Sequence, residues 1–194
     1  MSNEPLIEFL QSTNLVSLAA AKEIADQFTY KSIAKNEFQL MEGKVCDEYL
    51  FLQNGFMRSF AYDTEGNEVT TGFYCHGFVV FEISSFFNRT RSKENIIALS
   101  DCEGWYVTFE QFNGFFHAIP QFREFGRSIL VKGFAALKNR MLSMITETAE
   151  ERYEQLLKTN PQVFQYAPLK TIATYLGVTD TSLSRIRKDL SKKS

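Results

Sequence analysis

The spacing of hydrophobic residues divides the chain into a helical start, a β-rich middle and a helical second half. Residues 4–30 carry apolar positions at helical spacing, with a break near Ser12-Thr13-Asn14. From residue 31 the pattern changes to short apolar runs that are separated by turns containing glycine or asparagine. Such runs, recurring about every ten residues, are typical of an antiparallel sandwich or barrel. The expected strands are residues 38–41, 48–53, 56–62, 68–74, 95–99 and 104–107.

Helical spacing returns at Phe109. A short helix is expected over residues 109–116, and a long one from Pro120 to about Thr148. One apolar stripe on the long helix recurs at alternating steps of four and three residues, which predicts a seam with a second copy of the chain. This stripe consists of Leu130, Phe134, Leu137, Met141, Met144 and Thr148.

A second stripe on the same helix predicts that its other side covers the β-rich region. Gly126 and Gly133 share one heptad position, where two helix backbones could approach closely. The alternative is a helix that is buried wholly within one chain. The second stripe consists of Phe122, Phe125, Ile129, Leu142 and Ile145.

Two short helices around a tight turn are predicted near the C-terminus, over residues 169–190, after a helix over 149–157. Gly177 lies just past the first helix, where a positive φ suits glycine, and Thr179 is the natural N-cap of the second. Together they predict a helix-turn-helix, with a plain helical hairpin as the alternative. The expected buried positions are Ile172, Ala173, Leu176, Val178, Leu183, Ile186 and Leu190.

Charge is distributed unevenly along the 194 residues. The whole chain has a net charge of −2. Residues 180–194 contain five Lys or Arg against two Asp, a local charge of +3, which leaves −5 for the preceding residues. A basic end on an acidic body suits a segment that faces a nucleic-acid duplex.

Composition and spacing argue against membrane proteins, metal proteins and enzymes. Apolar runs fall short of the roughly 20 residues that span a bilayer, and the N-terminus lacks the order of a signal peptide, so we expect a cytoplasmic protein without membrane contact. Cys46, Cys75 and Cys102 are widely spaced, and His76 lies far from His117, which disfavours a metal cluster. No catalytic constellation stands out, and nineteen phenylalanines predict an aromatic-rich core.

Short helices, a β-roll, a long helix and a terminal helix-turn-helix, in this order, resemble the Crp/Fnr superfamily of bacterial transcription regulators. Residues 148–153 and 168–190 look most like the branch common in Bacteroidetes, and residues 63–68 and 77–83 match the family's cyclic-nucleotide-binding roll. The resemblance implies an α+β fold: an antiparallel β-roll (a double-stranded jelly roll), a long dimerisation helix and a C-terminal helix-turn-helix. The implied domains are residues 1–119 (helices and sensor roll), 120–148 (dimerisation helix) and 149–194 (DNA-binding, with the wing absent or truncated).

In this family a phosphate-binding cassette pairs a Phe-x-Gly-Glu-Leu turn with a following Arg-Ser or Arg-Thr. The glycine lets backbone N–H groups approach the anion, the arginine neutralises the charge, and the glutamate accepts a hydrogen bond from the ribose hydroxyl. Here Phe81 stands at the glycine position and Ser92-Lys93 stands where Arg-Ser is expected, and a lysine offers charge without a bidentate fork. The effector pocket implied by the resemblance comprises Phe81, Glu82, Ile83, Arg91, Ser92, Lys93, Leu137 and Lys138.

The effector site is therefore expected to depart from that of cyclic-AMP binders. Leu137 and Lys138 stand where those proteins reach the base with small hydroxyl residues. A cyclic nucleotide, another small anionic or apolar effector, or no ligand are the open choices, with tight cyclic AMP binding the least favoured. For Glu82 and Lys93, the alternative is a partly buried ion pair or solvated loop charges.

In the recognition helix, the family's base-reading positions fall on Asp180, Thr181 and Arg185. Arginine suits a bidentate contact to guanine, while Asp180 could accept from cytosine or merely cap the helix, which is the safer interpretation. The remaining polar residues would contact phosphates. These are Thr171, Ser182, Ser184, Arg187, Lys188, Lys192 and Lys193.

The sequence thus supports a homodimeric, sequence-specific transcription regulator that binds double-stranded DNA, with RNA polymerase as a candidate partner. Two alternatives stay open. One is a β-roll small-molecule binding module whose C-terminal helices only pack. The other is a haem, iron–sulfur or thiol redox sensor.

Overall fold

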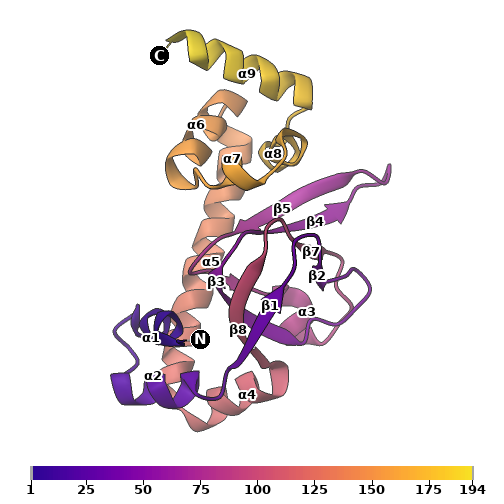
Figure 1. Cartoon of the computed structure of the whole chain (residues 1–194). Coiled ribbons are helices and arrows are strands. Elements are labelled where there is room, and N and C mark those ends of the chain that lie inside the picture. The colour runs from indigo at the N-terminus through magenta and orange to yellow at the C-terminus, as the bar shows by residue number, and fades with distance from the viewer. Residues whose placement is uncertain (1, 194) are drawn as a thin grey trace.

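The computed structural model describes residues 2–193 and shows a β-roll, a long helix along its side and a small helical domain at one end (Figure 1). Helices α1, α2 and α4 lie at the opposite end from that domain. The helices are α1 (Glu4–Gln11), α2 (Leu18–Ala25), α3 (Ile83–Asn88), α4 (Phe109–Ala118), α5 (Pro120–Thr146), α6 (Ala149–Thr159), α7 (Val163–Tyr166), α8 (Leu169–Leu176) and α9 (Asp180–Lys193). The strands are β1 (Thr29–Ile33), β2 (Phe38–Leu40), β3 (Glu48–Asn54), β4 (Met57–Tyr62), β5 (Glu68–Tyr74), β6 (Val79–Val80), β7 (Asn95–Ala98) and β8 (Cys102–Thr108).

The roll consists of two four-stranded sheets, in the orders β1-β8-β3-β6 and β2-β7-β4-β5. Neighbouring strands pair antiparallel, which confirms the expected architecture. Strand β1 was missed because its first residues were assigned to the N-terminal helical region. Helix α2 already ends at Ala25, and the following Thr29–Ile33 segment is rich in residues that favour strands. Strand β6 has two residues and is too short to show a pattern.

Aromatic residues fill the core between the roll and the adjoining helices, as nineteen phenylalanines predicted. Phe86 of α3 lies 5.3 Å from Phe112 of α4, measured between ring centroids, and Phe112 lies 5.3 Å from Phe122 of α5. Phe51 and Phe125 are also fully buried. The first turns of α5 are therefore fixed to the roll by burial of large apolar surfaces, each contributing about 1.5–3 kcal/mol.

A second core joins the roll to the C-terminal helices, and the sequence did not predict it. Phe56, beside β4, stacks on Tyr166 of α7 at 5.2 Å, and Phe73 of β5 lies 5.0 Å from Tyr175 of α8. The Thr70 backbone N–H also donates to the Thr174 hydroxyl at 3.1 Å. The helix-turn-helix domain is thus packed directly on the outside of the β4–β5 hairpin.

Helix α5 leaves one apolar face uncovered over its second half. Phe134 is 70% exposed, and Leu137 and Met141 are exposed as well, as a seam with a second copy requires. The expectation for the second stripe was only half right. Phe122, Phe125 and Ile129 do cover the roll, but the remaining two members of that stripe, Leu142 and Ile145, are exposed.

Three details of the long helix differ from expectation. A Cβ atom at Gly126 would lie 2.6 Å from the Phe116 ring, so this glycine admits helix α4 rather than a partner helix, while Gly133 is open. Met144 reaches the turn after α8, where its Cε would lie 2.4 Å from a Cβ at Gly177. Helix α5 ends at Thr146, and Thr148 belongs to the next element, because its side chain forms a capping box at the start of α6.

Replacing Gly177 by alanine should lower the free energy of unfolding by more than the same change at Gly66. Both glycines have positive φ, +69° and +83°, where an L-residue costs about 1–2 kcal/mol. A new Cβ at Gly66 meets nothing within 4 Å, whereas at Gly177 it would lie 2.4 Å from the terminal methyl of Met144, a flexible side chain that can turn aside, so the additional loss should be small. Urea denaturation of both variants measures the difference, and equal losses would show that Met144 does not constrain the turn.

Candidate functional site

The predicted helix-turn-helix is present. Ile172, Ala173 and Leu176 form the buried side of α8, and Gly177 ends it in the left-handed conformation. The Val178 N–H then donates to the Ala173 carbonyl at 3.0 Å, which closes the turn. These contacts follow from local sequence signals, so the sequence was sufficient to find them.

Helix α9 begins with a side-chain cap. The Thr179 hydroxyl accepts from the Ser182 N–H at 3.2 Å, so Thr179 caps the helix as expected. Asp180 is the first residue of α9 and does not provide this cap, although its charge still favours the helix N-terminus. Leu183 is buried, and Ile186 and Leu190 pack on the same core.

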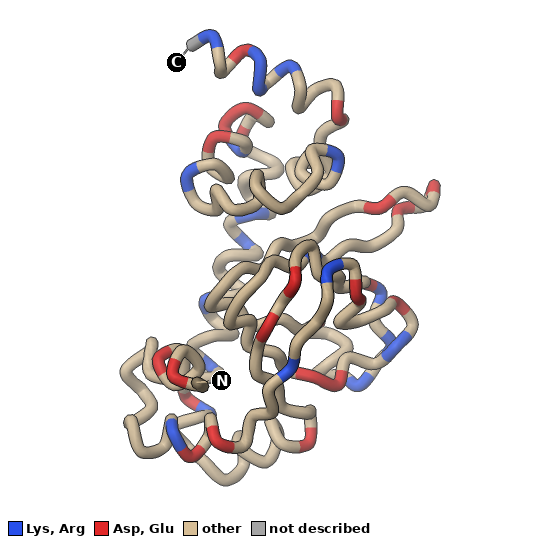
Figure 2. Tube along the Cα trace, viewed as in Figure 1, with Lys and Arg blue, Asp and Glu red and all other residues tan. Residues whose placement is uncertain are grey.

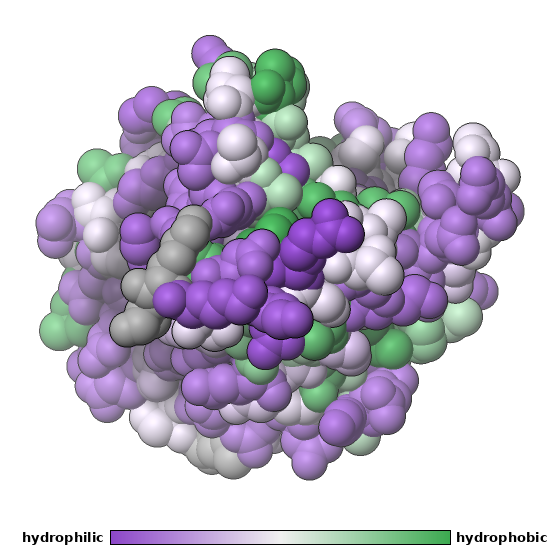
Figure 3. Space-filling model, turned by 90° about the horizontal axis from the view of Figure 1, so that it is seen from above, coloured by the Kyte–Doolittle hydropathy of each residue, from purple (hydrophilic) through white to green (hydrophobic). Residues whose placement is uncertain are grey.

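The opposite side of α9 is free and basic. The helix crosses the end of the molecule, with its cationic residues towards the C-terminus (Figure 2). Seen from above, this end of the molecule is mostly hydrophilic (Figure 3). The exposed candidate DNA contacts are Asp180, Thr181, Ser182, Ser184, Arg185, Arg187 and Lys188.

Three other candidate contacts are placed differently. The Thr171 side chain is half-buried, and its hydroxyl donates to the Pro168 carbonyl at 2.7 Å. Lys192 is exposed and lies 3.9 Å from Asp189, a weak pair one helical turn apart. The side chain of Lys193 lies outside the described part of the structure.

The effector cassette is occupied by the chain itself. The Phe81 ring, at the position where the family has glycine, lies 5.1 Å from Tyr49 and 5.3 Å from Phe86. The Glu82 carboxylate accepts from the Ser84 and Ser85 N–H groups at 2.9 and 2.7 Å, and thereby caps α3. A carboxylate therefore takes the backbone donors of this turn, and its charge repels an anion.

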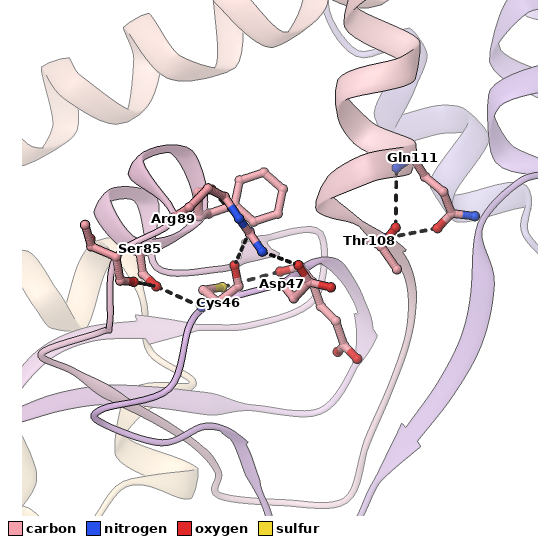
Figure 4. Close-up of polar contacts among 9 residues, drawn as sticks. Cys46, Asp47, Ser85, Arg89, Thr108 and Gln111 are labelled. Atoms are coloured by element: carbon pink, nitrogen blue, oxygen red, sulfur yellow. Dashed lines mark hydrogen bonds and ion pairs between the residues drawn. The ribbon is translucent and has the colours of Figure 1, made fainter.

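The cations that surround the cassette do not converge on it. Arg89 donates to the Cys46 carbonyl at 3.0 Å and pairs with Asp47 at 2.5 Å, as Figure 4 shows. Arg91 and Lys93 are exposed, whereas Ser92 is buried and its hydroxyl donates to the Glu94 carbonyl at 2.8 Å. Ile83, Leu137 and Lys138 are also exposed, the last two on α5.

The interior of the roll behind the cassette is polar and acidic, which sequence spacing did not reveal. The Thr71 hydroxyl donates to the buried Ser59 hydroxyl at 2.8 Å, and Tyr74 reaches the same oxygen at 3.5 Å. Burial raises the pKa of the Glu94 carboxyl, and the charge of Glu82 raises it further, while Thr71 and Arg140 oppose the shift. The raised pKa favours the neutral form of Glu94, so this carboxyl adds a further polar group to the region around Ser59.

Arg140 of α5 connects three parts of the molecule. Its guanidinium group donates to the Thr71 carbonyl of β5 at 2.5 Å and to the Tyr175 carbonyl of α8 at 3.2 Å. It also lies over the Tyr175 ring, 4.1 Å from the centroid. The sequence could not identify this residue, because its partners lie 35 and 69 positions away.

Among residues 2–193, no group of three or more His, Cys, Asp or Glu side chains could hold a metal ion, and no helix has the length and hydrophobicity of a membrane span. Burial raises the pKa of the Cys46, Cys75 and Cys102 thiols, which makes the reactive thiolate scarce and disfavours a thiol sensor.

Residues 30–118 match the family model of the cyclic nucleotide-binding domain. No curated protein matches the sequence. Similar solved structures include FixK2 from Bradyrhizobium japonicum, which is 19% identical, with a TM-score of 0.73 over 86% of this chain and 85% of FixK2.

Two further structures agree with this result. A protein from Eubacterium rectale, described as a transcriptional regulator of the Crp/Fnr family, is 15% identical, with a TM-score of 0.72 over 96% of this chain and 88% of its own. The c-di-GMP-responsive global regulator CLP of Xanthomonas campestris is 13% identical, with a TM-score of 0.68 over 87% of this chain and 88% of its own. Both of these proteins are described as regulators. Residues 30–118 thus form a cyclic nucleotide-binding domain, and the whole chain has the fold of the Crp/Fnr family of transcription regulators.

Proposed function

We propose that the protein is a cytoplasmic, homodimeric transcription regulator that binds double-stranded DNA at specific sequences, of the Bacteroidetes-type Crp/Fnr branch. The observation that carries this proposal is the free, basic side of α9 on a helix-turn-helix whose other side is packed. A recognition helix needs this combination, because it must be rigidly supported and still enter the major groove.

The exposed stripe of α5 supports a dimer. Phe134, Leu137 and Met141 present apolar surface on a helix that is fixed to the roll at its other end. Pairing two such helices would set two α9 helices on one side of the dimer. Recognition helices of this type enter successive major grooves about 34 Å apart, so the site should be a near-palindrome.

The proposed DNA contacts are of two kinds, contacts to base edges and contacts to phosphates. We assign the reading of guanine to Arg185, which is exposed, and further base contacts to Asp180 and Thr181, which are exposed as well. Arg187, Lys188 and Lys192 supply charge to the phosphates, which positions the helix without reading sequence. RNA polymerase is a candidate partner of a regulator bound in this way.

We also propose that the roll does not bind cyclic AMP tightly. Phe81 fills the close-approach position, and the Glu82 carboxylate occupies the backbone donors with a negative charge. A different effector, or none, fits this site better. c-di-GMP responsiveness is a property of CLP, whose roll has the same fold.

Arg185→Ala should weaken binding to the selected DNA site by about 1–3 kcal/mol and relax its sequence preference, because one bidentate base contact is lost. Lys192→Ala should weaken binding about equally on all sequences and reduce the salt slope by about one. Selection from random duplexes, followed by anisotropy titrations at two salt concentrations, measures both effects. The proposal fails if selection yields no preferred sequence.

Phe134→Lys should raise the dimer dissociation constant by about tenfold or more, because a charge would have to be buried in an apolar seam. Asn139→Lys adds the same charge to the same helix outside the stripe and should leave the dimer intact. Sedimentation velocity over a concentration series compares the two. Equal behaviour of both variants would rule out this seam.

Cyclic AMP at 1 mM should raise the melting temperature by less than about 1 °C, since a ligand stabilises the folded state only by binding it. A dissociation constant of about 10 μM would contribute about 2.7 kcal/mol at that concentration, or about 5–10 °C for a chain of this size. Scanning fluorimetry makes the measurement, and a rise in that range would refute the degenerate site.

A further inference from the structure

A cavity of about 570 Å³ lies where the long helix meets the helix-turn-helix domain. Its walls come from the second half of α5, from α6 and from the end of α8, so it is separate from the roll and from the DNA-facing side of α9. The volume falls within the range of about 300–1,000 Å³ that is usual for small-molecule sites. Apolar surface comes from Leu142, Leu156 and Leu176.

Two arginines line this cavity. Arg152 donates from Nε and Nη2 to the Leu176 carbonyl at 3.2 and 2.9 Å, and from Nη1 to the Glu147 carbonyl at 2.6 Å. A guanidinium group has five N–H donors. Arg152 therefore uses three of its five, and Arg140 uses two of its five, on the carbonyls of Thr71 and Tyr175.

The hydrogen bonds that both arginines donate go to neutral backbone carbonyls. In the described part of the chain, neither guanidinium group forms an ion pair with a carboxylate. The carboxylate in the wall, that of Glu147, accepts from the Ser143 hydroxyl at 2.5 Å. Glu94, on which the charge of Arg140 acts, belongs to the roll and not to this wall. The lining thus carries two positive charges and one negative charge.

We propose that this cavity binds a small organic anion, a carboxylate or phosphate on an apolar body, through the unused donors of Arg140 and Arg152. Charge-assisted hydrogen bonds to a planar guanidinium group are the strong ones, and the leucine wall suits the rest of the molecule. Because its walls belong to α5, α6 and α8, an occupant fixes the angle between the long helix and the helix-turn-helix. This last consequence rests on the proposed DNA-binding function, whereas the binding itself does not.

Isothermal titration calorimetry with phenyl phosphate tests the site on the full chain, with benzyl alcohol as the uncharged analogue. We expect one phenyl phosphate per chain and no heat from benzyl alcohol. Arg140→Gln and Arg152→Gln should each weaken binding by about tenfold or more, and Lys158→Gln, an exposed cation of α6 outside the cavity, should leave it unchanged.

Asn139→Trp provides an independent test, because it fills the cavity while both arginines remain. It should abolish phenyl phosphate binding, and its melting temperature shows whether the fold is kept. No binding at millimolar concentration, or equal binding in the wild type and in all cavity variants, would overturn the proposal. The assay contains no DNA, so failure of the DNA-binding proposal is measured separately.

Discussion

The Arg140 guanidinium group connects the β-roll to the helix-turn-helix domain. This side chain of α5 donates hydrogen bonds to the Thr71 carbonyl of β5 and the Tyr175 carbonyl of α8, and it lies over the Tyr175 ring. Phe56 and Phe73 add aromatic contacts between the roll and the C-terminal helices, to Tyr166 and Tyr175. The direction of α9 therefore depends on a polar and aromatic contact at the opposite side of the helix-turn-helix domain, between β5, α5 and α8. A movement of the Thr71 backbone in the roll would act through Arg140 on α8 of the helix-turn-helix.

Local signals in the sequence were sufficient to predict the helix-turn-helix domain. Gly177, Thr179 and the apolar spacing of two short helices define a helix-turn-helix through contacts within a few residues, and the structure confirms each. Long-range contacts could not be inferred in this way. Arg140 bonds residues that are remote in sequence, and Met144 looks like a seam residue until its contact with Gly177 is seen. Glu82 is the residue that the family has at this position, yet its carboxylate accepts hydrogen bonds from the first backbone N–H groups of α3.

The β-roll and the helix-turn-helix therefore differ in how closely they match the family's sequence pattern. The roll keeps its strands, but Phe81 packs on Tyr49 at the family's glycine position and the Glu82 carboxylate accepts from the backbone N–H groups of its own turn. The cavity between α5, α6 and α8 has the opposite character, with two arginines that lack a carboxylate partner in the described residues. The two arginines make the cavity between α5, α6 and α8 a better site for an anionic ligand than the roll. Arg140 donates to β5 of the roll and also lines this cavity, so a ligand in either place would act on the same contact between the roll and α8.

The central claim is that two recognition helices read DNA on one face of a symmetric dimer. Hydroxyl-radical footprinting on a selected duplex tests it most directly, because the cleavage pattern reports where the backbone is covered. Two symmetry-related protected segments on one face, one helical turn or about 10–10.5 base pairs apart, are the predicted result. A single protected segment, or uniform protection along the duplex, would contradict the account.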